Sequence, residues 1–567
     1  MHLRSTSRGT WIFWITALLV LGAGIGLRDP WPSDEPRFAL VAMRMVETGN
    51  WLFPHRGDEL YSDKPPMFMW LQAASYLLVG NWRVAFLLPS LLAALGTLWC
   101  VVDLGRRLWT PRVGLYAGWA LLLTLHFTGQ SKKAQIDALL MFWITVANYG
   151  LLRHLLRGPD WPMWWLGWFA AGLGTITKGV GGLALAMLLP AAFASLRGWP
   201  GIAFHLRGGW RLWIAPAFLL LAVSLWLVPM LAAALGSQVP EYRAYVDDIL
   251  FRQTVQRYTD SWQHVQPPWF FLEIMATRWP PLLLLLPWAL PAWRHRIRRR
   301  DPRILLPLAW WLLLALFFSV PLGKRAVYIL PALPMACLAM APLLPALMRK
   351  VGPQRMALGF VLLLSVLTLL LAAALMWPHS PLRERLAEDR GFAAFTGLAA
   401  MLAALGTLGL LLAARYRGAR VWVAVATLLG AGWVSYGLAG YPLLNDATSG
   451  RDFMNGVARR LPADAQLGMV AWREQLVIQS DRPVTTFGFD RPWDQQLLRA
   501  RDWQLLVPQR RWLLIEERAL SPCVDRARAE YVGNNNHRRW WLVPARAQQP
   551  RCVPPPHPVE VDADALD

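Results

Sequence analysis

Asp34 begins a stretch whose residue types and spacing could support acid–base chemistry. Ser33, Asp34 and Glu35 precede Pro36, and apolar residues then recur at helical spacing until Gly49. This pattern predicts an amphipathic helix on the outer membrane face, with Asp34 at the positive end of its dipole, which favours the ionised carboxylate. An ionised carboxylate in that place is a candidate general base. The alternative is that Asp34 only caps the helix.

Lysine is rare in this chain, which makes its positions informative. The sequence has six Lys against 51 Arg, and five of the six lie in segments that we assign below to the outer side. Orientation in a membrane requires no positive charge there, so compact ammonium groups suit a phosphate or pyrophosphate arriving from the lipid phase. The alternative is that these side chains snorkel to the interface, which fits the adjacent pair better than the others. The five are Lys64, Lys132, Lys133, Lys178 and Lys324.

Two further positions on the same side carry groups that suit a reaction site. Asp137 lies at the outer end of a predicted membrane span, where an acid needs either a task or a partner such as Lys132 or Lys133. Lys324 and Tyr328 are four residues apart, which predicts that they share one helical face. An ammonium and a phenol on one face could hold one phosphate.

Membrane helices must position these residues, because 56% of the 567 residues are apolar and only 16% are charged. A string of soluble domains is thereby excluded. We count thirteen spans, although the pair between 162 and 196 could instead be one long helix and a re-entrant turn. The spans are 11–27, 82–104, 113–129, 134–152, 162–177, 180–196, 212–235, 279–293, 304–319, 326–347, 357–377, 393–414 and 420–440.

The net charge of +22 belongs to the membrane part and sets orientation. Residues 441–567 hold 17 Arg and 16 acidic residues, which leaves 40 basic and 19 acidic residues in 1–440. That excess lies in seven Arg clusters in short loops, which we place in the cytoplasm. Nucleic-acid binding is excluded as an explanation of the charge. An odd number of spans then predicts a cytoplasmic amino terminus and a periplasmic carboxy terminus, in a multi-pass protein of the bacterial inner membrane.

The chain divides into two predicted domains. Residues 1–440 form the transmembrane domain, with outer loops at 28–81 and 236–278. Residues 441–567 mix short apolar runs with polar stretches, which predicts a periplasmic α/β domain whose end, from Pro554, is disordered. We expect the first span to be an uncleaved anchor, because charged residues and a proline follow it where a signal-peptide cleavage site requires small residues.

The four cysteines fall into two groups. Cys100 and Cys337 lie within predicted spans and are expected to be small apolar fillers. Cys523 and Cys552 both lie in the predicted periplasmic domain, where disulfides are permitted. We expect these two to pair, and the alternative is two free thiols.

An ordered set of motifs resembles the bacterial aminoarabinose transferase family. It comprises Arg28 to Trp31, Asp34 to Arg37, Gly49 to Trp51, Tyr61 to Trp70, the Asp137 span, Thr177 to Gly179, Gln266 to Trp269 and Lys324 to Pro331. The resemblance implies a polytopic α-helical membrane protein of the C-type glycosyltransferase fold, related to the protein mannosyltransferases. Such enzymes move a sugar, with inversion, from an undecaprenyl-phosphate carrier to an acceptor such as lipid A on the periplasmic face.

The same resemblance implies roles for individual residues. Asp34 becomes the candidate catalytic base or acceptor-orienting acid, and Asp137 the second acid. The donor phosphate is expected to contact Lys64, Arg37 and Tyr328, with Tyr61 nearby and with Lys324 from the argument above.

A divalent metal ion is a further expectation from the family. Asp63 and His264 match the positions of its ligands. Asp63 stands where the family usually has the longer Glu, and a lone histidine such as His264 is more often structural.

Other functions remain open from the sequence. The acceptor could be a protein or another glycan. A transporter would place ionisable groups near the membrane midplane, between broken helices, rather than at outer helix ends. A non-catalytic subunit that binds the lipid carrier would keep the cationic residues without needing Asp34.

Overall fold

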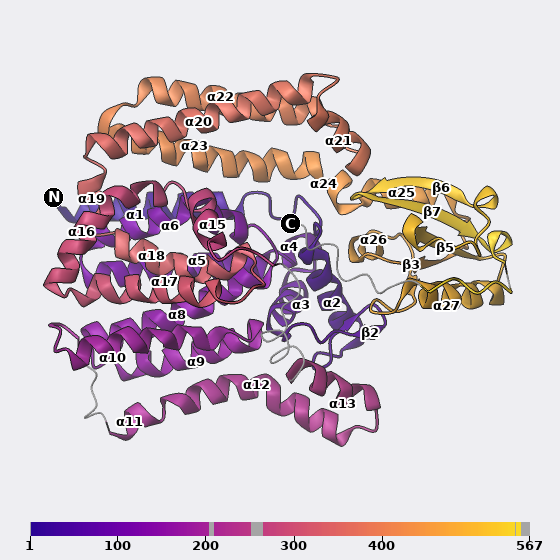
Figure 1. The fold of residues 1–567 in the computed structure, drawn as a ribbon, viewed down its shortest axis with the longest axis horizontal. Helices are drawn as coiled ribbons and strands as arrows, with labels where there is room; N and C mark the ends of the chain where they lie inside the picture. The colour runs from indigo at the N-terminus through magenta and orange to yellow at the C-terminus, as the bar shows by residue number, and fades with distance from the viewer. Residues whose placement is uncertain (1, 203–208, 251–264, 550, 557–567) are drawn as a thin grey trace.

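The computed structural model describes residues 2–202, 209–250, 265–549 and 551–556. It consists of a large helical body with a small α/β domain at one end (Figure 1). The first helices of the body are α1 (His2–Gly22), α5 (Leu88–Leu108), α6 (Pro111–Leu122), α7 (Leu125–Ser131), α8 (Ile136–Arg157), α9 (Trp161–Lys178), η1 (Gly181–Met187), α10 (Leu188–Leu196), α11 (Trp210–Trp213) and α12 (Ala215–Gly236).

The rest of the body consists of apolar helices joined by Arg-rich turns. Helices α20, α22 and α23 pack together along one side of the body (Figure 1). The helices in this second part of the body are α15 (Phe270–Arg278), η4 (Leu283–Leu285), α16 (Leu286–Arg299), α17 (Pro302–Ser319), η5 (Ala326–Ala332), α18 (Leu333–Met340), α19 (Leu344–Leu347), α20 (Val351–Met376), α22 (Phe395–Arg415), η6 (Gly418–Arg420), α23 (Val421–Ser435), η7 (Tyr436–Gly440) and α24 (Tyr441–Ser449).

Seven helical segments among the described residues are long and apolar enough to cross a membrane. An eighth is added if α15 and the segment Leu283–Arg299, which meet at a bend of 103°, count as one broken span. Each of the seven overlaps a predicted span. They are Trp82–Leu108, Ile136–Arg157, Trp210–Gly236, Pro302–Ser319, Val351–Met376, Phe395–Arg415 and Gly418–Ser449.

The count of thirteen spans is not confirmed. Three predicted spans coincide with apolar helices of only 10–17 residues, and the segment 113–129 is divided between α6 and α7. Hydropathy alone did not show these interruptions, because an apolar sequence continues across a turn of the backbone as readily as along a helix. The segment 162–196 forms two separate helical pieces, with Gly179 in left-handed backbone (φ 82°) between them.

The outer elements lie at the end of the body that faces the α/β domain (Figure 1). Between α1 and α5 the chain forms helices and a short antiparallel hairpin, β1–β2. Two further outer helices follow α12 and α20. The outer elements are α2 (Asp34–Thr48), β1 (His55–Arg56), β2 (Glu59–Leu60), α3 (Met67–Val79), α4 (Trp82–Ala85), α13 (Pro240–Asp247) and α21 (Pro381–Arg390).

The carboxy-terminal domain is a five-stranded sheet with the order β4-β3-β5-β7-β6. Strand β3 is parallel to both β4 and β5, whereas β7 runs antiparallel to β5 and β6. The predicted α/β class is therefore confirmed. The elements are α25 (Arg451–Arg460), β3 (Gln466–Val470), α26 (Glu474–Ile478), β4 (Val484–Thr486), α27 (Trp493–Leu506), β5 (Arg511–Glu516), η8 (Glu517–Ala519), η9 (Arg526–Arg528), β6 (Glu530–Asn535), β7 (Arg538–Pro544) and η10 (Ala545–Ala547).

A disulfide cross-links this domain internally, and a continuous helical segment connects it to the body. A disulfide joins Cys523 and Cys552, as predicted, while Cys100 and Cys337 are buried free thiols. The last span runs through η7 and α24 to Ser449. The predicted division at residues 440 and 441 therefore falls inside a continuous helical segment, and it stays a prediction.

Candidate active site

Helix α2 carries the first candidate residue and lies between the helical body and the carboxy-terminal domain (Figure 1). It ends at the predicted place because Gly49 adopts left-handed backbone (φ 71°), which other residues avoid. Phe38 packs against α3, whereas Leu40 packs with Trp472 of the domain. The predicted helix is confirmed, but its outer side is covered by protein instead of lying on a membrane surface.

Asp34 is the first residue of α2, and its carboxylate contacts two other elements. Oδ2 accepts a hydrogen bond from Gln135 Nε2 at 2.9 Å and lies 3.4 Å from a guanidinium nitrogen of Arg325. The side chain remains 16% exposed. These contacts orient a carboxylate that a substrate can still reach. The N-cap residue of α2 is Ser33, so Asp34 lies in the first turn of the helix, and its role as a base stays a prediction.

The β1–β2 hairpin leads into Tyr61, Asp63 and Lys64. Tyr61 is buried, and this burial, followed by the negative charge of Asp63, raises the pKa of its phenol. The charges of Arg37 and Asp34 also act on the phenol, which places these groups in one cluster. Lys64 Nζ donates a hydrogen bond to the backbone carbonyl of Asp63 at 2.9 Å. Four residues predicted from the sequence, Asp34, Arg37, Tyr61 and Asp63, are thus gathered by the first outer loop, and Lys64 follows Asp63 directly.

Arg37 contacts a carboxylate that the sequence analysis did not single out. Its Nε lies 3.4 Å from Glu474 Oε1, and Arg56 of β1 pairs with the same oxygen. Burial alone would raise the pKa of Glu474, but the positive charges of Arg56 and Arg37 outweigh it and hold the pKa at about 2. Glu474 is therefore ionised at neutral pH, and it gives two arginines of the loop a fixed direction.

The hairpin itself is held by the carboxyl edge of the parallel strands in the carboxy-terminal domain. Glu59 accepts hydrogen bonds from the backbone N–H groups of Phe489 at 2.7 Å and Asp490 at 3.3 Å. Asp58 accepts one from the Thr486 hydroxyl at 2.7 Å. In open α/β sheets this edge commonly binds a ligand. Here it binds the outer loop, so the domain forms one wall of the candidate site.

Asp137 belongs to a second charged group. It is buried at the start of α8 and pairs with Lys178 at the end of α9, rather than with Lys132 or Lys133. The ammonium of Lys178 lies 5.1 Å from the centre of the Tyr328 ring. Lys132 is also buried, and it donates to two backbone carbonyls near the end of α1 at 3.0 and 2.7 Å. Interfacial snorkelling therefore does not describe Lys132.

Lys324 and Tyr328 do not share a helical face as predicted. The helix η5 begins only at Ala326, as a 3-10 helix that follows an extended residue, so Lys324 lies before it. The ammonium of Lys324 donates to the backbone carbonyl of Gln266 at 2.9 Å. This contact joins two outer loops, whereas Tyr328 belongs to the group around Asp137.

The chain is similar to known membrane glycosyltransferases. It is 31% identical over 412 residues to the undecaprenyl phosphate-alpha-4-amino-4-deoxy-L-arabinose arabinosyl transferase of Pectobacterium carotovorum, covering 68% of this chain and 70% of that protein. The chain belongs to this arabinosyltransferase family. The protein of the same name from Pseudomonas aeruginosa is 31% identical over 380 residues, which is 64% of each chain. Residues 63–234 also match the family described as dolichyl-phosphate-mannose-protein mannosyltransferase.

Solved structures agree with the fold of the arabinosyltransferase family. ArnT from Cupriavidus metallidurans bound to undecaprenyl phosphate superposes with a TM-score of 0.69 at 20% identity, covering 96% of this chain and 99% of that one. Its apo state gives a TM-score of 0.70 at 19% identity. The chain therefore has the membrane C-type glycosyltransferase fold, and the family resemblance inferred from its motifs is confirmed.

The metal site that the arabinosyltransferase resemblance implies stays a prediction. His264 lies outside the described residues. Among the residues that the structure describes, His, Cys, Asp and Glu side chains do not gather in threes into a group that could hold a metal ion. Asp63 alone is a single carboxylate beside cationic neighbours, so we derive no step of the reaction from a metal.

Several residues of the candidate site were not recognised from the sequence. Gln135, Arg325 and Glu474 contact candidate residues that are far from them along the chain. Arg56 lies within the outer loop and was not singled out either. One local signal existed for Glu474, which is an acid placed just after an apolar strand, at the edge where α/β domains gather polar side chains. The others had no such signal.

Proposed function

We propose that this chain transfers 4-amino-4-deoxy-L-arabinose from undecaprenyl phosphate to lipid A at the outer face of the bacterial inner membrane. The observation that carries the proposal is the partly exposed carboxylate of Asp34, held by two side chains beside a cluster of cations on the first outer loop. Membership of the arabinosyltransferase family supports the choice of donor.

Asp34 acts on the acceptor. An acceptor oxygen attacks the anomeric carbon of the sugar from the side opposite the lipid phosphate, and Asp34 takes its proton. The new bond joins the anomeric carbon to the acceptor oxygen, while the bond to the phosphate oxygen breaks. A single displacement of this kind inverts the anomeric centre. Gln135 and Arg325 keep the Asp34 carboxylate oriented for the transfer of the proton.

The cations of the loop act on the leaving group. Negative charge develops on the lipid phosphate as the sugar departs, and fixed positive charges stabilise it. Lys64 and Arg37 supply these charges, and Tyr61 lies near Arg37. Glu474 holds Arg37 in place through its carboxylate, so the carboxy-terminal domain takes part in building the phosphate site.

The group around Asp137 serves the donor sugar and its phosphate. Lys178 is placed between the Asp137 carboxylate and the Tyr328 ring, which fixes the direction of its ammonium. Tyr328 then offers its phenol to the donor. Asp137 keeps the positive charge of Lys178 compensated inside the protein.

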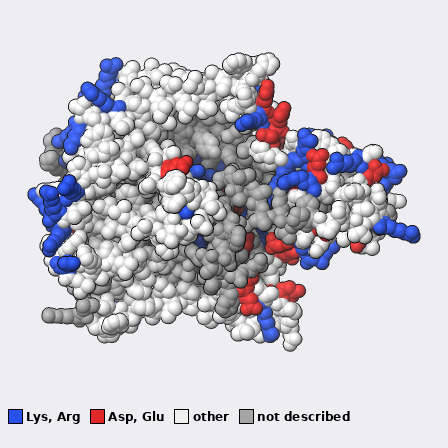
Figure 2. Space-filling model, viewed as in Figure 1, with Lys and Arg blue, Asp and Glu red and all other residues white. Residues whose placement is uncertain are grey.

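The charge pattern supports an orientation with the site on the periplasmic side. Figure 2 shows Lys and Arg along the end of the body opposite the carboxy-terminal domain, whereas acidic and basic side chains are mixed on the domain and beside it. Positively charged loops face the cytoplasm in inner-membrane proteins. We therefore place the amino terminus in the cytoplasm, and the outer loops and the carboxy-terminal domain in the periplasm.

Other functions make different predictions about Asp34. A transporter or a non-catalytic carrier-binding subunit would keep its activity when Asp34 becomes Asn. A transferase with a protein or another glycan as its acceptor would need Asp34 but would leave lipid A unmodified.

The test is a transfer assay with purified chain in lipid nanodiscs, undecaprenyl phosphate-aminoarabinose and lipid A, analysed by mass spectrometry. The expected product is lipid A heavier by one aminoarabinose residue, with turnover lost in Asp34→Asn although donor binding persists. Unmodified lipid A together with consumed donor would point to another acceptor. An active Asp34→Asn variant would remove the proposed chemistry.

A further inference from the structure

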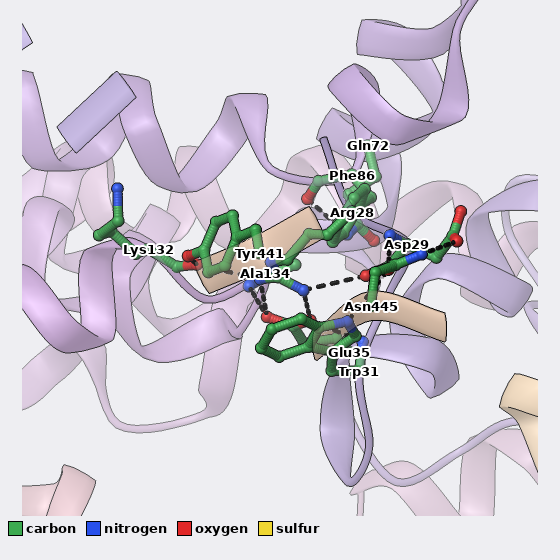
Figure 3. Close-up of polar contacts among 10 residues, drawn as sticks. All are labelled: Arg28, Asp29, Trp31, Glu35, Gln72, Phe86, Lys132, Ala134, Tyr441 and Asn445. Atoms are coloured by element: carbon green, nitrogen blue, oxygen red, sulfur yellow. Dashed lines mark hydrogen bonds and ion pairs between the residues drawn. The ribbon is translucent and has the colours of Figure 1, made fainter. Parts of the chain in front are cut away.

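Glu35 follows the candidate base directly, and its carboxylate is fully engaged. Oε1 accepts hydrogen bonds from the backbone N–H of Ala134 at 2.9 Å and from Arg28 at 2.7 Å (Figure 3). Oε2 accepts one from the backbone N–H of Trp31 at 2.8 Å and pairs with the other terminal nitrogen of Arg28. One buried carboxylate therefore fastens the start of α2 to the segment that precedes α8.

That segment also carries the hydrogen-bond donor to the candidate base. Ala134 precedes Gln135, whose side-chain amide donates to Asp34 at 2.9 Å. Asp34 is the sequence neighbour of Glu35 itself. Gln135 is the neighbour of Ala134, whose backbone N–H donates to Glu35. A shift of Glu35 would change the geometry of the contact between Asp34 and Gln135.

Arg28 fixes the position of Glu35. Its side chain is 2% exposed, and its guanidinium carbon lies 4.8 Å from the Trp31 ring, 5.2 Å from the Phe86 ring and 4.8 Å from the Tyr441 ring (Figure 3). It also donates to the backbone carbonyls of Asp29 and Lys132, each at 3.0 Å. A planar guanidinium enclosed by rings and engaged on both terminal nitrogens is held in one orientation.

We propose that Arg28 is a positioning residue for the reaction, which acts on Asp34 through Glu35. The inference rests on the proposed role of Asp34 as the base. Only two described contacts orient the Asp34 carboxylate directly, and the side chain is partly exposed. The position of the carboxylate therefore depends on the backbone at the start of α2. The described contacts of Arg28 do not include the cations assigned to the donor phosphate. Its loss should therefore impair proton transfer more than donor binding.

The experiment compares Arg28→Lys and Phe86→Leu with wild type in the transfer assay. Arg28→Lys keeps the charge but loses the paired contacts to Glu35, and Phe86→Leu removes one ring of the enclosure. We expect kcat to fall at least tenfold in Arg28→Lys and by less in Phe86→Leu, with affinity for undecaprenyl phosphate within about twofold of wild type in both. Phe86→Leu decides the question if Arg28→Lys does not fold.

Arg83→Gln is the matched control. Arg83 pairs with Asp29, the neighbour of Arg28, and makes no described contact with Glu35. This variant should keep the wild-type kcat. A wild-type kcat in the tested variants, or a loss of donor affinity as large as the loss of kcat, would overturn the proposal. Full turnover in Asp34→Asn would instead show that the proposed base is wrong, and this outcome is separate from the behaviour of Arg28.

Discussion

Asp34 and Lys64 are assigned different parts of the reaction, and single substitutions separate them. Asp34→Asn should lower kcat by about 10²- to 10⁴-fold, the usual contribution of a general base, with little loss of donor binding. Lys64→Ala should weaken donor binding at least tenfold, because it removes a charge-assisted contact to phosphate. Donor titrations of kcat and KM, together with direct binding of undecaprenyl phosphate, measure both effects.

The control for this pair is Lys350→Ala. Lys350 is exposed at the start of α20, in a turn that we place on the cytoplasmic side. Its removal should leave kcat and donor affinity unchanged. Equal turnover in wild type and Asp34→Asn would return Asp34 to a structural role in α2.

Glu474 makes the stability of the folded protein depend on pH. Its pKa in the folded protein is about 2, below the 4.5 of an unperturbed glutamate. A depressed pKa contributes stability that is present above pH 4.5 and is lost as the pH falls toward 2. Wild type should therefore lose thermal stability over this range more steeply than Glu474→Gln. Unfolding temperatures of both proteins between pH 3 and 7 test this, and parallel curves would contradict it.

At neutral pH, Glu474→Gln should be costly. Removing one partner from a buried ion pair typically destabilises by about 3–5 kcal/mol, because the remaining charges are left uncompensated. Donor affinity should fall as well, since Arg37 loses its fixed direction. Glu516→Gln is the matched control, because Glu516 is equally buried and paired with Arg538 but lies away from the outer loop. It should reduce stability without a selective loss of donor affinity.

Predictions for single residues succeeded where local sequence decides the outcome. Gly49 ends α2 as expected, because its left-handed backbone is a local signal, whereas Ser33 is the N-cap residue but makes no side-chain capping hydrogen bond. The partner of Asp137 was not predicted, because Lys178 reaches it only when α8 and α9 pack together. Glu474 was missed for the same reason, since its meeting with Arg37 depends on how the domain docks.

At the scale of elements, the β1–β2 hairpin should report how firmly the carboxy-terminal domain is docked. Glu59→Gln weakens the acceptor for the amides of Phe489 and Asp490. A hydrogen bond of this kind contributes about 1 kcal/mol, so these amides should exchange with deuterium several-fold faster. Hydrogen–deuterium exchange followed by mass spectrometry resolves the segment that contains them.

Glu530→Gln provides the comparison for this measurement. It breaks the exposed pair between Arg460 and Glu530, which lies in the same domain but does not contact the hairpin. Exchange around residue 489 should be unchanged in this variant. Unchanged exchange in Glu59→Gln as well would mean that the hairpin does not hold the domain.

The apolar pattern predicted the existence of most helices but not what covers them. In α2 the periodic residues identified the buried face, yet Leu40 on the other side is also buried, against Trp472. A helix with one apolar face suits a membrane surface and a protein interface equally well. Only the presence of the carboxy-terminal domain, more than 400 residues later in the chain, distinguishes the two.

At the scale of the whole molecule, composition and motif order were the informative signals. They predicted the membrane class, the α/β domain and the family, because each is a sum over many residues and survives local errors. The pairing of Cys523 with Cys552 was also predicted correctly, because these are the two cysteines outside predicted spans. The number of spans did not follow, because helices such as η1 and α10 are apolar without being long enough to cross.

The orientation of the whole chain in the membrane can be measured directly. The Arg-rich turns, such as the one that ends α16, and the outer loops lie at opposite ends of the helical body (Figures 1 and 2). Alkaline phosphatase fused after Asp567 should therefore be active, because it folds only in the periplasm, and a fluorescent protein fused after Arg298 should fluoresce, because it folds in the cytoplasm. The reverse pattern would place the carboxy-terminal domain and Asp34 in the cytoplasm. An acceptor on the outer leaflet could not reach the site in that case.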